Sequence, residues 1–214
     1  MNPTYRIVWL IARALFYTYF RGRYFYPERV PLSGPVILAA NHASVLDPPL
    51  IGAGFNRIVN YLARKTLMDI PVFGALLRRL SVVPVDRDGG GGAGLKAILD
   101  RLLNGGIILL FPEGTRTADG NLQPAKSGVG LTVIKSTAPV VPVRVRGTFE
   151  AFGREMKFPM PRRVTLVYGE PMHFKALREE AKTCSKPRLK EIYQQAADEI
   201  MAVIASLEVP KKRG

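Results

Sequence analysis

Short apolar runs alternate with longer stretches of helical periodicity along most of the chain. The apolar runs predict strands at residues 35–40, 59–63, 81–85, 106–111, 140–145 and 163–168. The stretches between them predict helices that begin near residue 48 and cover residues 71–80, 94–103, 128–136 and 187–207. Strands separated by helices of this length are typical of a parallel sheet. The pattern therefore predicts an α/β fold, a mainly parallel central sheet flanked by helices, with the alternating run 163–168 near an edge.

The N-terminal segment has a different pattern. Residues 7–20 (IVWLIARALFYTYF) carry one charge, Arg13, and as a helix they would be roughly 21 Å long, too short for the ~30 Å core of a bilayer. The following RGRYFYPERV has no small-residue cleavage site, which argues against a signal peptide. Its aromatic residues and flanking arginines suit the boundary between acyl chains and headgroups. We therefore expect residues 1–30 to form a membrane-associated segment, with an ordinary core helix as the alternative, and residues 31–210 to form the main domain.

Composition narrows the choice of partners. The 214 residues, 47% of them hydrophobic, are enough for one domain with a buried core. The 31 Lys and Arg against 17 Asp and Glu give a net charge of +14, which favours an anionic partner: nucleic acid, an acidic membrane surface or a phosphorylated substrate. Cys184 is the only cysteine, so an intrachain disulfide and a Cys/His zinc module are excluded.

The first candidate site follows the predicted strand 35–40 directly. His42 is followed five residues later by Asp47, at the start of a predicted helix. An imidazole can act as a general base near neutral pH when a carboxylate holds one of its ring nitrogens. The nucleophile would then be a hydroxyl of the substrate itself. The alternative is that Asn41, Ser44 or Asp47 caps the helix and His42 is merely its hydrogen-bonded neighbour.

The second candidate site, FPEGTR at residues 111–116, follows the strongest predicted strand. Glu113 can bind a polyol hydroxyl, Arg116 can bind an oxyanion, and Gly114 permits a close approach of the backbone to a ligand. The alternative is a surface turn with a salt bridge. Arg87 and Lys126 are further cations that could complete a pocket for a phosphate, although each, taken alone, is more often solvated. Because parallel sheets bind ligands at the carboxyl ends of their strands, we expect these residues to meet there.

Four sequence blocks together resemble a known family. NHASVLD (residues 41–47) matches an NHxSxxD motif and FPEGTR matches the third block. The second block is present as RKTL, IPVFG and VDR within residues 64–87, and the fourth as VVPV at residues 140–143. In order and spacing the chain resembles the bacterial 1-acyl-glycerol-3-phosphate acyltransferases of the glycerolipid acyltransferase superfamily, over about residues 30–150.

The resemblance implies a glycerol-3-phosphate acyltransferase-like fold and a role for each residue that matches a motif. His42 would be the catalytic base and Asp47 its orienting partner. The other implied contacts are to glycerol, from Glu113 and Gly114, and to phosphate, from Arg87, Thr115 and Arg116. Lys126 would also bind substrate, although Ala125 stands where related sequences often have an aromatic residue.

The resulting hypothesis is that His42 deprotonates the free hydroxyl of lysophosphatidic acid, which then attacks an acyl thioester to give phosphatidic acid. Acyl-CoA or acyl carrier protein is the expected co-substrate, and no cofactor, metal or nucleic-acid partner is expected. We expect a peripheral or monotopic protein on the cytoplasmic face of the cell membrane. The alternatives are another acceptor (glycerol 3-phosphate, another lysophospholipid or a lyso-aminolipid) or a non-catalytic protein that binds anionic lipid or nucleic acid. The hypothesis requires the imidazole and the phosphate-binding arginines to open onto a common cavity.

Overall fold

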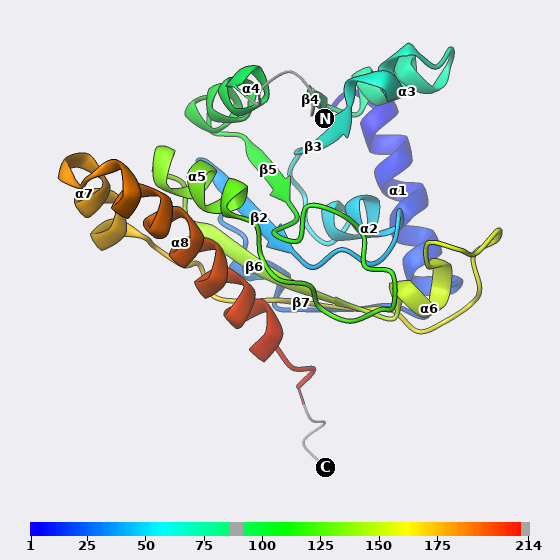
Figure 1. The fold of residues 1–214 in the computed structure, drawn as a ribbon. Helices are drawn as coiled ribbons and strands as arrows, with labels where there is room; N and C mark the ends of the chain where they lie inside the picture. Colours follow the sequence, from blue (N-terminus) through cyan, green and yellow to red (C-terminus); the bar gives the residue numbers. More distant parts are fainter. Residues whose placement is uncertain (86–91, 211–214) are drawn as a thin grey trace.

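The computed structural model describes residues 1–85 and 92–210 and contains one seven-stranded sheet (Figure 1). The strand order is β1-β7-β6-β2-β5-β3-β4. The strands are β1 (Arg23–Phe25), β2 (Val36–Ala40), β3 (Val59–Arg64), β4 (Val82–Val85), β5 (Ile107–Leu110), β6 (Val140–Arg146) and β7 (Thr165–Tyr168). Five neighbouring strands, β6-β2-β5-β3-β4, are mutually parallel, which confirms the predicted mainly parallel α/β fold.

The remaining two strands run in the opposite direction. Strand β7 pairs antiparallel with β6, and β1 pairs parallel with β7 at the outer edge. The prediction of a last strand near an edge is therefore confirmed, but strand β1 was not predicted. Its three residues, RYF, are too few to show an alternating pattern.

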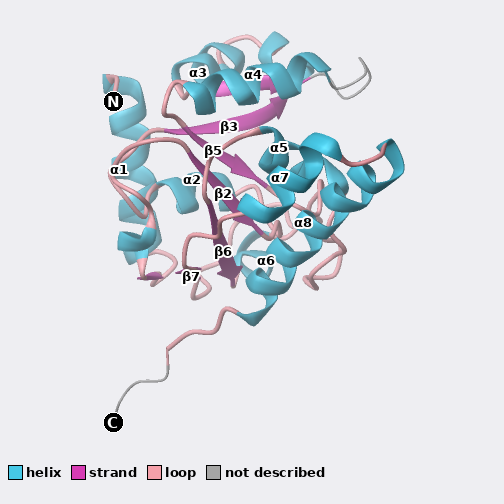
Figure 2. Ribbon diagram, turned by 90° about the vertical axis from the view of Figure 1, so that its left-hand side faces the viewer, coloured by secondary structure: helices cyan, strands magenta, loops and turns pink. Residues whose placement is uncertain are grey.

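Helices cover both faces of this sheet. They are α1 (Pro3–Thr18), α2 (Asp47–Gly52), α3 (Phe73–Arg79), α4 (Gly92–Leu103), α5 (Ser127–Lys135), α6 (Thr148–Phe152), α7 (Lys175–Thr183) and α8 (Lys186–Ser206), with 3-10 turns η1 (Pro27–Arg29) and η2 (Lys65–Asp69). In Figure 2, α1 and α2 lie on one side of the sheet and α5, α7 and α8 on the other. Two of these helices, α6 and α7, were not predicted. Helix α6 has only five residues, and α7 is mostly polar, with Leu177 and Ala181 packed against the core.

The central strands are buried on both faces because side chains alternate between two cores. In β2, Ile37 and Ala39 pack on the side of α5 and α8, whereas Val36, Leu38 and Ala40 pack on the side of α1 and α2. All five are fully buried. Burial on both faces explains why the sequence of this strand is a continuous apolar run. It also holds the carboxyl end of the strand in place.

Helix α1 has one buried and one exposed apolar side. It begins at an Asn2 cap, whose side chain accepts a hydrogen bond from the Tyr5 N–H. Ala12 and Phe16 are buried, while the outward side exposes Ile7, Leu10, Ile11 and Leu15. Within the described residues, no helix is long and apolar enough to cross a membrane. Because Phe16 belongs to the same core as β2 and α2, α1 packs on the main domain, while its membrane contact and the boundary at residue 30 stay predictions.

Candidate active site

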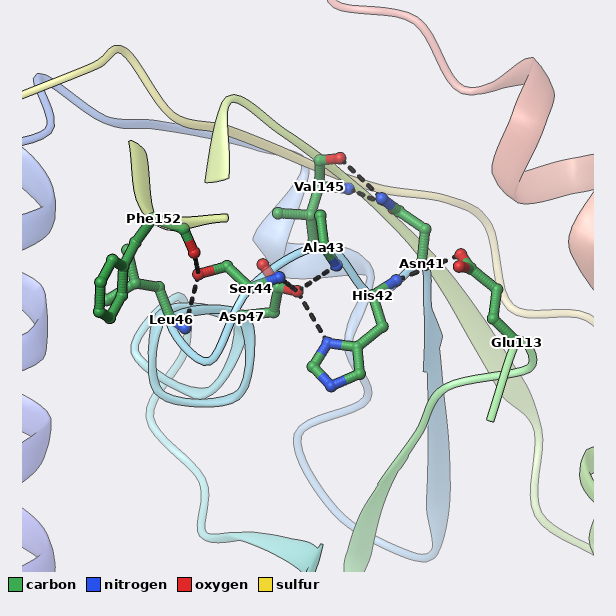
Figure 3. A network of polar contacts seen from close by, with 9 residues as sticks. All are labelled: Asn41, His42, Ala43, Ser44, Leu46, Asp47, Glu113, Val145 and Phe152. Atoms are coloured by element: carbon green, nitrogen blue, oxygen red, sulfur yellow. Dashed lines mark hydrogen bonds and ion pairs between the residues drawn. The ribbon is translucent and has the colours of Figure 1, made fainter. Parts of the chain in front are cut away.

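The turn between β2 and α2 brings His42 and Asp47 together. Strand β2 ends at Ala40, and α2 begins with Asp47 itself. The distance between His42 Nδ1 and Asp47 Oδ2 is 2.9 Å (Figure 3). Because a carboxylate only accepts hydrogen bonds, this contact places the ring proton on Nδ1 and leaves Nε2 free to accept a proton.

Asp47 also closes the turn that carries His42. The same oxygen, Oδ2, accepts hydrogen bonds from the backbone N–H groups of Ala43 (2.7 Å) and Ser44 (2.8 Å). The Asp47 side chain is 0% exposed and that of His42 is 17% exposed. The carboxylate therefore shapes the turn and also contacts the imidazole. The two interpretations of this motif, a local capping role and a His-Asp pair, are compatible.

Two other polar residues of the motif tie the turn to the rest of the fold, and sequence reasoning gave them no such role. Asn41 forms a reciprocal pair with the Val145 backbone of β6, with distances of 2.9 and 2.8 Å. Ser44 donates its hydroxyl to the Phe152 carbonyl at the end of α6 (2.7 Å). In the sequence, the sign of a role for these two residues was that both belong to NHASVLD. Their long-range partners became visible only in the fold.

The other end of α2 is also held by side chains. A helix of six residues leaves most of its carbonyl groups without a partner inside the helix. Hydroxyl groups of Tyr24 and Tyr168 donate to the carbonyls of Leu50 and Ile51, at 2.9 and 2.7 Å. From α1, side-chain nitrogens donate to two carbonyls just beyond the helix: Arg13 to Ala53 (2.9 Å) and Trp9 to Phe55 (3.1 Å). The single charge of the N-terminal apolar run thus supports the helix on which Asp47 lies.

The FPEGTR loop holds the main chain and the ring of His42. The His42 N–H donates to Glu113 Oε1 (3.2 Å), and the His42 carbonyl accepts from the Thr117 N–H (2.8 Å). The Phe111 ring stacks on the imidazole with centroids 3.8 Å apart and an interplanar angle of 12°. The two predicted sites are therefore one, because the second motif fixes the position of the histidine in the first.

Glu113 lies behind the His42 main chain, away from the imidazole (Figure 3), and it does not line the cavity described below. It is 2% exposed, and burial raises the pKa of its carboxyl group to about 7, although the His42 hydrogen bond and the Arg144 charge act in the opposite direction. Burial in turn lowers the pKa of Arg144. This placement gives Glu113 a positioning contact, whereas the resemblance implied a contact with glycerol.

We expect Glu113→Gln to change the pH dependence of stability. A carboxyl group with a folded pKa near 7 and an unfolded value of ~4.3 favours the folded state when protonated, so its contribution is lost as the pH rises through this window. Glutamine does not titrate and still offers an oxygen to the His42 N–H. Relative to the wild type, the free energy of unfolding of the variant should rise by about 2–3 kcal/mol between pH 5 and pH 8. Urea unfolding at both pH values measures this, and a pH-independent difference would contradict it.

A cavity of about 780 Å³ opens beside His42 at the carboxyl ends of the parallel strands. Four of the predicted substrate-binding residues line it, Gly114, Thr115, Arg116 and Lys126. At Gly114, φ is +72°, and a Cβ atom would lie 3.0 Å from the Lys126 side chain, so glycine suits both the backbone and the close packing. The imidazole and the FPEGTR arginine thus share one cavity, as the hypothesis requires. Arg87 lies outside the described residues.

Two further cations line this cavity and were not among the predicted site residues. They are Arg64, at the end of β3, and Arg154, just after α6. Arg64 belongs to the second sequence block, and this position could have marked it as a site residue. Arg154 comes from a loop that contains no motif. None of the described residues that line the cavity is acidic, so the cavity favours anionic ligands.

A second, largely apolar pocket of about 530 Å³ also includes His42 in its lining. Its walls come from α1, the start of α2, β3 and the segment around α3. They include Tyr5, Val8, Trp9, Ala12, Pro48, Leu62, Leu67, Leu77 and Leu80. The imidazole therefore lies where a cationic cavity and an apolar pocket meet. This arrangement suits a substrate that has both an anionic group and an acyl chain.

The fold and the site define a class of protein: an α/β protein with a hydrogen-bonded His-Asp pair at the carboxyl edge of its sheet, next to a site for an amphiphilic anion. Within the described residues, no group of three or more His, Cys, Asp or Glu side chains could hold a metal ion. The sequence matches the model of the Acyltransferase family over residues 23–146, more than half of the chain. The chain belongs to this acyltransferase family.

Individual relatives agree with this assignment. The chain is 29% identical over 147 residues to a 1-acyl-sn-glycerol-3-phosphate acyltransferase of Bacillus subtilis, a match that covers 68% of this chain and 71% of the relative. It is 30% identical over 164 residues to an N-acylphosphatidylethanolamine synthase of Arabidopsis thaliana, covering 67% of this chain and 58% of the relative. The crystal structure of the 1-acyl-sn-glycerophosphate acyltransferase from Thermotoga maritima has the same fold, with a TM-score of 0.72 and 24% identity over 96% of this chain and 81% of that one.

Proposed function

We propose that this chain transfers a fatty acyl group from an acyl thioester to the free hydroxyl of lysophosphatidic acid and so forms phosphatidic acid. The observation that carries the proposal is the position of His42, which lines both the cationic cavity and the apolar pocket. The name of the Bacillus relative supports the choice of acceptor. Acyl-CoA and acyl carrier protein both carry the required thioester, and the reaction uses no other cofactor.

In the proposed mechanism, His42 acts as general base. With Nδ1 held by Asp47, Nε2 removes the proton of the substrate hydroxyl while its oxygen attacks the thioester carbonyl carbon. A C–O bond forms, the C–S bond breaks, and the imidazolium returns its proton to the departing thiolate. The carboxylate stabilises the imidazolium in between. Cys184 does not line either cavity, which agrees with direct transfer and no acyl-enzyme.

The two cavities divide the substrates by polarity. Arg116, Lys126 and Thr115 are the proposed partners of the acceptor phosphate, since they line the same cavity as the imidazole. Arg64 and Arg154 offer further positive charge to the phosphate groups of the acyl donor. The apolar pocket, which Trp9 and other α1 residues help to form, would take up an acyl chain.

We further propose that the protein lies on the cytoplasmic face of the cell membrane. The apolar residues that α1 exposes, with the arginines next to the helix, suit the interface of an anionic leaflet. Such a position would give an insoluble acceptor direct access to the apolar pocket.

An acceptor panel tests this proposal. Radiolabelled acyl-CoA and acyl carrier protein are each supplied with lysophosphatidic acid, glycerol 3-phosphate, other lysophospholipids and phosphatidylethanolamine, and the products are identified. Labelled phosphatidic acid is the expected major product. The Arabidopsis relative favours a second candidate, acylation of an aminophospholipid, which would appear as a labelled N-acyl lipid. An absence of product from every acceptor would contradict both.

With monoacylglycerol added to the panel, Arg116→Ala tests the phosphate contact. Loss of a charge-assisted hydrogen bond should raise KM for lysophosphatidic acid by about 10- to 100-fold. The KM for monoacylglycerol, which has no phosphate, should be the same as in the wild type. Arg101→Ala on the exposed side of α4 is the matched control and should change neither value. Equal effects on both acceptors would mean that Arg116 does not bind the phosphate.

A further inference from the structure

The loop between α6 and β7 exposes a large apolar tip. Phe158 is 78% exposed and Met160 is 45% exposed. Exposed aromatic side chains carry an unfavourable hydration cost, and when they stand together with other apolar residues they mark sites of interaction with proteins or membranes. Neither residue lines the cavities described above, so the catalytic proposal does not account for their exposure.

Backbone contacts hold this tip in place on both sides. The Met160 N–H donates to the Ala151 carbonyl (2.7 Å), which ties the tip to α6. The Tyr19 hydroxyl donates to the Pro159 carbonyl (2.9 Å), which ties it to the end of α1. The exposure of Phe158 therefore belongs to an anchored loop. In Figure 1 this loop lies beside the end of α1, on the side of the molecule away from α8.

The tip is surrounded by positive charge. Arg154, Lys157, Arg162 and Arg163 are exposed in the same loop, and Glu155 is its only carboxylate. An apolar tip between basic residues matches the interface of an anionic bilayer, where the apolar groups enter the headgroup region and the cations contact lipid phosphates. An acidic protein partner would account for the charges but would leave the apolar tip without a matching environment.

The tip also continues the exposed side of α1. Leu15, Tyr17 and Tyr19 are each about half exposed at the C-terminal end of this helix, and Tyr19 contacts the loop directly. Tyrosines are enriched at membrane interfaces, where the ring is in an apolar and the hydroxyl in a polar environment. The outward side of α1 and the loop tip thus form one surface.

We propose that residues 157–163 form a second membrane contact, which binds an anionic lipid bilayer together with the outward side of α1. The proposal rests on the membrane position proposed above and adds the segment that fixes the protein's orientation. Outward apolar residues run from Ile7 to Leu15, and the loop lies beyond them, so α1 lies along the membrane surface. The apolar pocket, to whose wall α1 contributes, is then held next to the lipid phase.

Binding to lipid vesicles tests the apolar part of this contact. The double variant Phe158→Ala, Met160→Ala should bind vesicles of phosphatidylcholine and phosphatidylglycerol at least roughly tenfold more weakly than the wild type, because the tip no longer buries its side chains. Leu103→Ala is the matched control, since Leu103 is 83% exposed but lies on α4, away from α1 (Figure 1). It should bind like the wild type. Unchanged binding by the double variant would overturn the proposal, as would an equal loss in the control.

The charged part has its own test. Lys157→Gln, Arg162→Gln should weaken binding to vesicles with phosphatidylglycerol severalfold and leave binding to pure phosphatidylcholine unchanged. An equal effect on both vesicle types would overturn the proposed role of these cations. With a soluble short-chain acceptor and donor, every loop variant should keep the wild-type turnover number. A loss of vesicle binding with normal turnover therefore separates this proposal from the proposed acyl transfer, which the acceptor panel tests independently.

Discussion

Replacing His42 with alanine is expected to lower the turnover number for acyl transfer by about 10²- to 10⁴-fold, the usual contribution of a positioned general base. The side chain is the only imidazole that lines the two cavities as described, and Asp47 holds it with Nε2 free. None of the other described residues that line the two cavities carries an imidazole or a carboxylate that could take up the hydroxyl proton. Steady-state assays with labelled acyl donor and lysophosphatidic acid measure the change.

The second histidine provides a matched control for this experiment. His173 is exposed and lines neither cavity, so His173→Ala should keep the wild-type turnover number. Circular dichroism and vesicle binding should be the same for both variants, since His42 contributes no large apolar area to the core. Near-normal turnover in His42→Ala would rule out the imidazole as the base. A loss of the folded signal would instead point to a structural role.

The fold was predictable where local pattern and burial agree. A strand such as β2 is apolar at every position because both of its faces are covered, and that feature is visible in the sequence. The parallel order of the five central strands follows from the helices that connect them. By contrast, β1 and α6 are only three and five residues long. Their conformation depends on contacts with neighbouring segments, so their own residues show little pattern from which secondary structure could be predicted.

The candidate site was predictable to the extent that it is local. His42 and Asp47 lie in one turn, so their spacing made a contact one of two interpretations, beside a helix cap, and the two side chains are 2.9 Å apart. Contacts between distant segments were not predictable from spacing. Glu113 is next in sequence to residues that line the cavity, but its side chain reaches behind the His42 main chain. Arg154 lines the cavity although it belongs to a loop that contains no motif.

The N-terminal helix shows why the alternatives for α1 were hard to separate. A membrane-facing helix and a core helix both require apolar residues, and α1 has them on opposite sides. Phe16 packs in the core, and Leu10 faces outward. Arg13, the only charge in the run, donates to the Ala53 carbonyl beyond the end of α2. The helix whose outward side we propose to contact a membrane therefore supports, with its other side, the turn that carries His42.

Asp47→Asn is expected to lower the turnover number by a similar factor, about 10²- to 10⁴-fold, with little change in KM. Asparagine has the same shape and still offers one oxygen to the Ala43 and Ser44 N–H groups, so the turn can be retained. The same oxygen also faces His42 Nδ1, because Asp47 Oδ2 makes all three contacts, but in asparagine it carries no negative charge. The imidazolium that forms when Nε2 takes up the substrate proton therefore loses the carboxylate that stabilises it, which raises the barrier to proton transfer.

A split between kcat and KM distinguishes this loss of charge from simple unfolding of the turn. If Asp47 only shapes the turn, asparagine should preserve activity, because it can accept the same backbone hydrogen bonds. If the Asp47 carboxylate stabilises the imidazolium, kcat falls while substrate binding and the unfolding midpoint in urea change little. Asp100→Asn on the exposed side of α4 is the matched control and should behave like the wild type. Wild-type kcat in Asp47→Asn would therefore contradict the proposed pairing even though the two side chains are in contact.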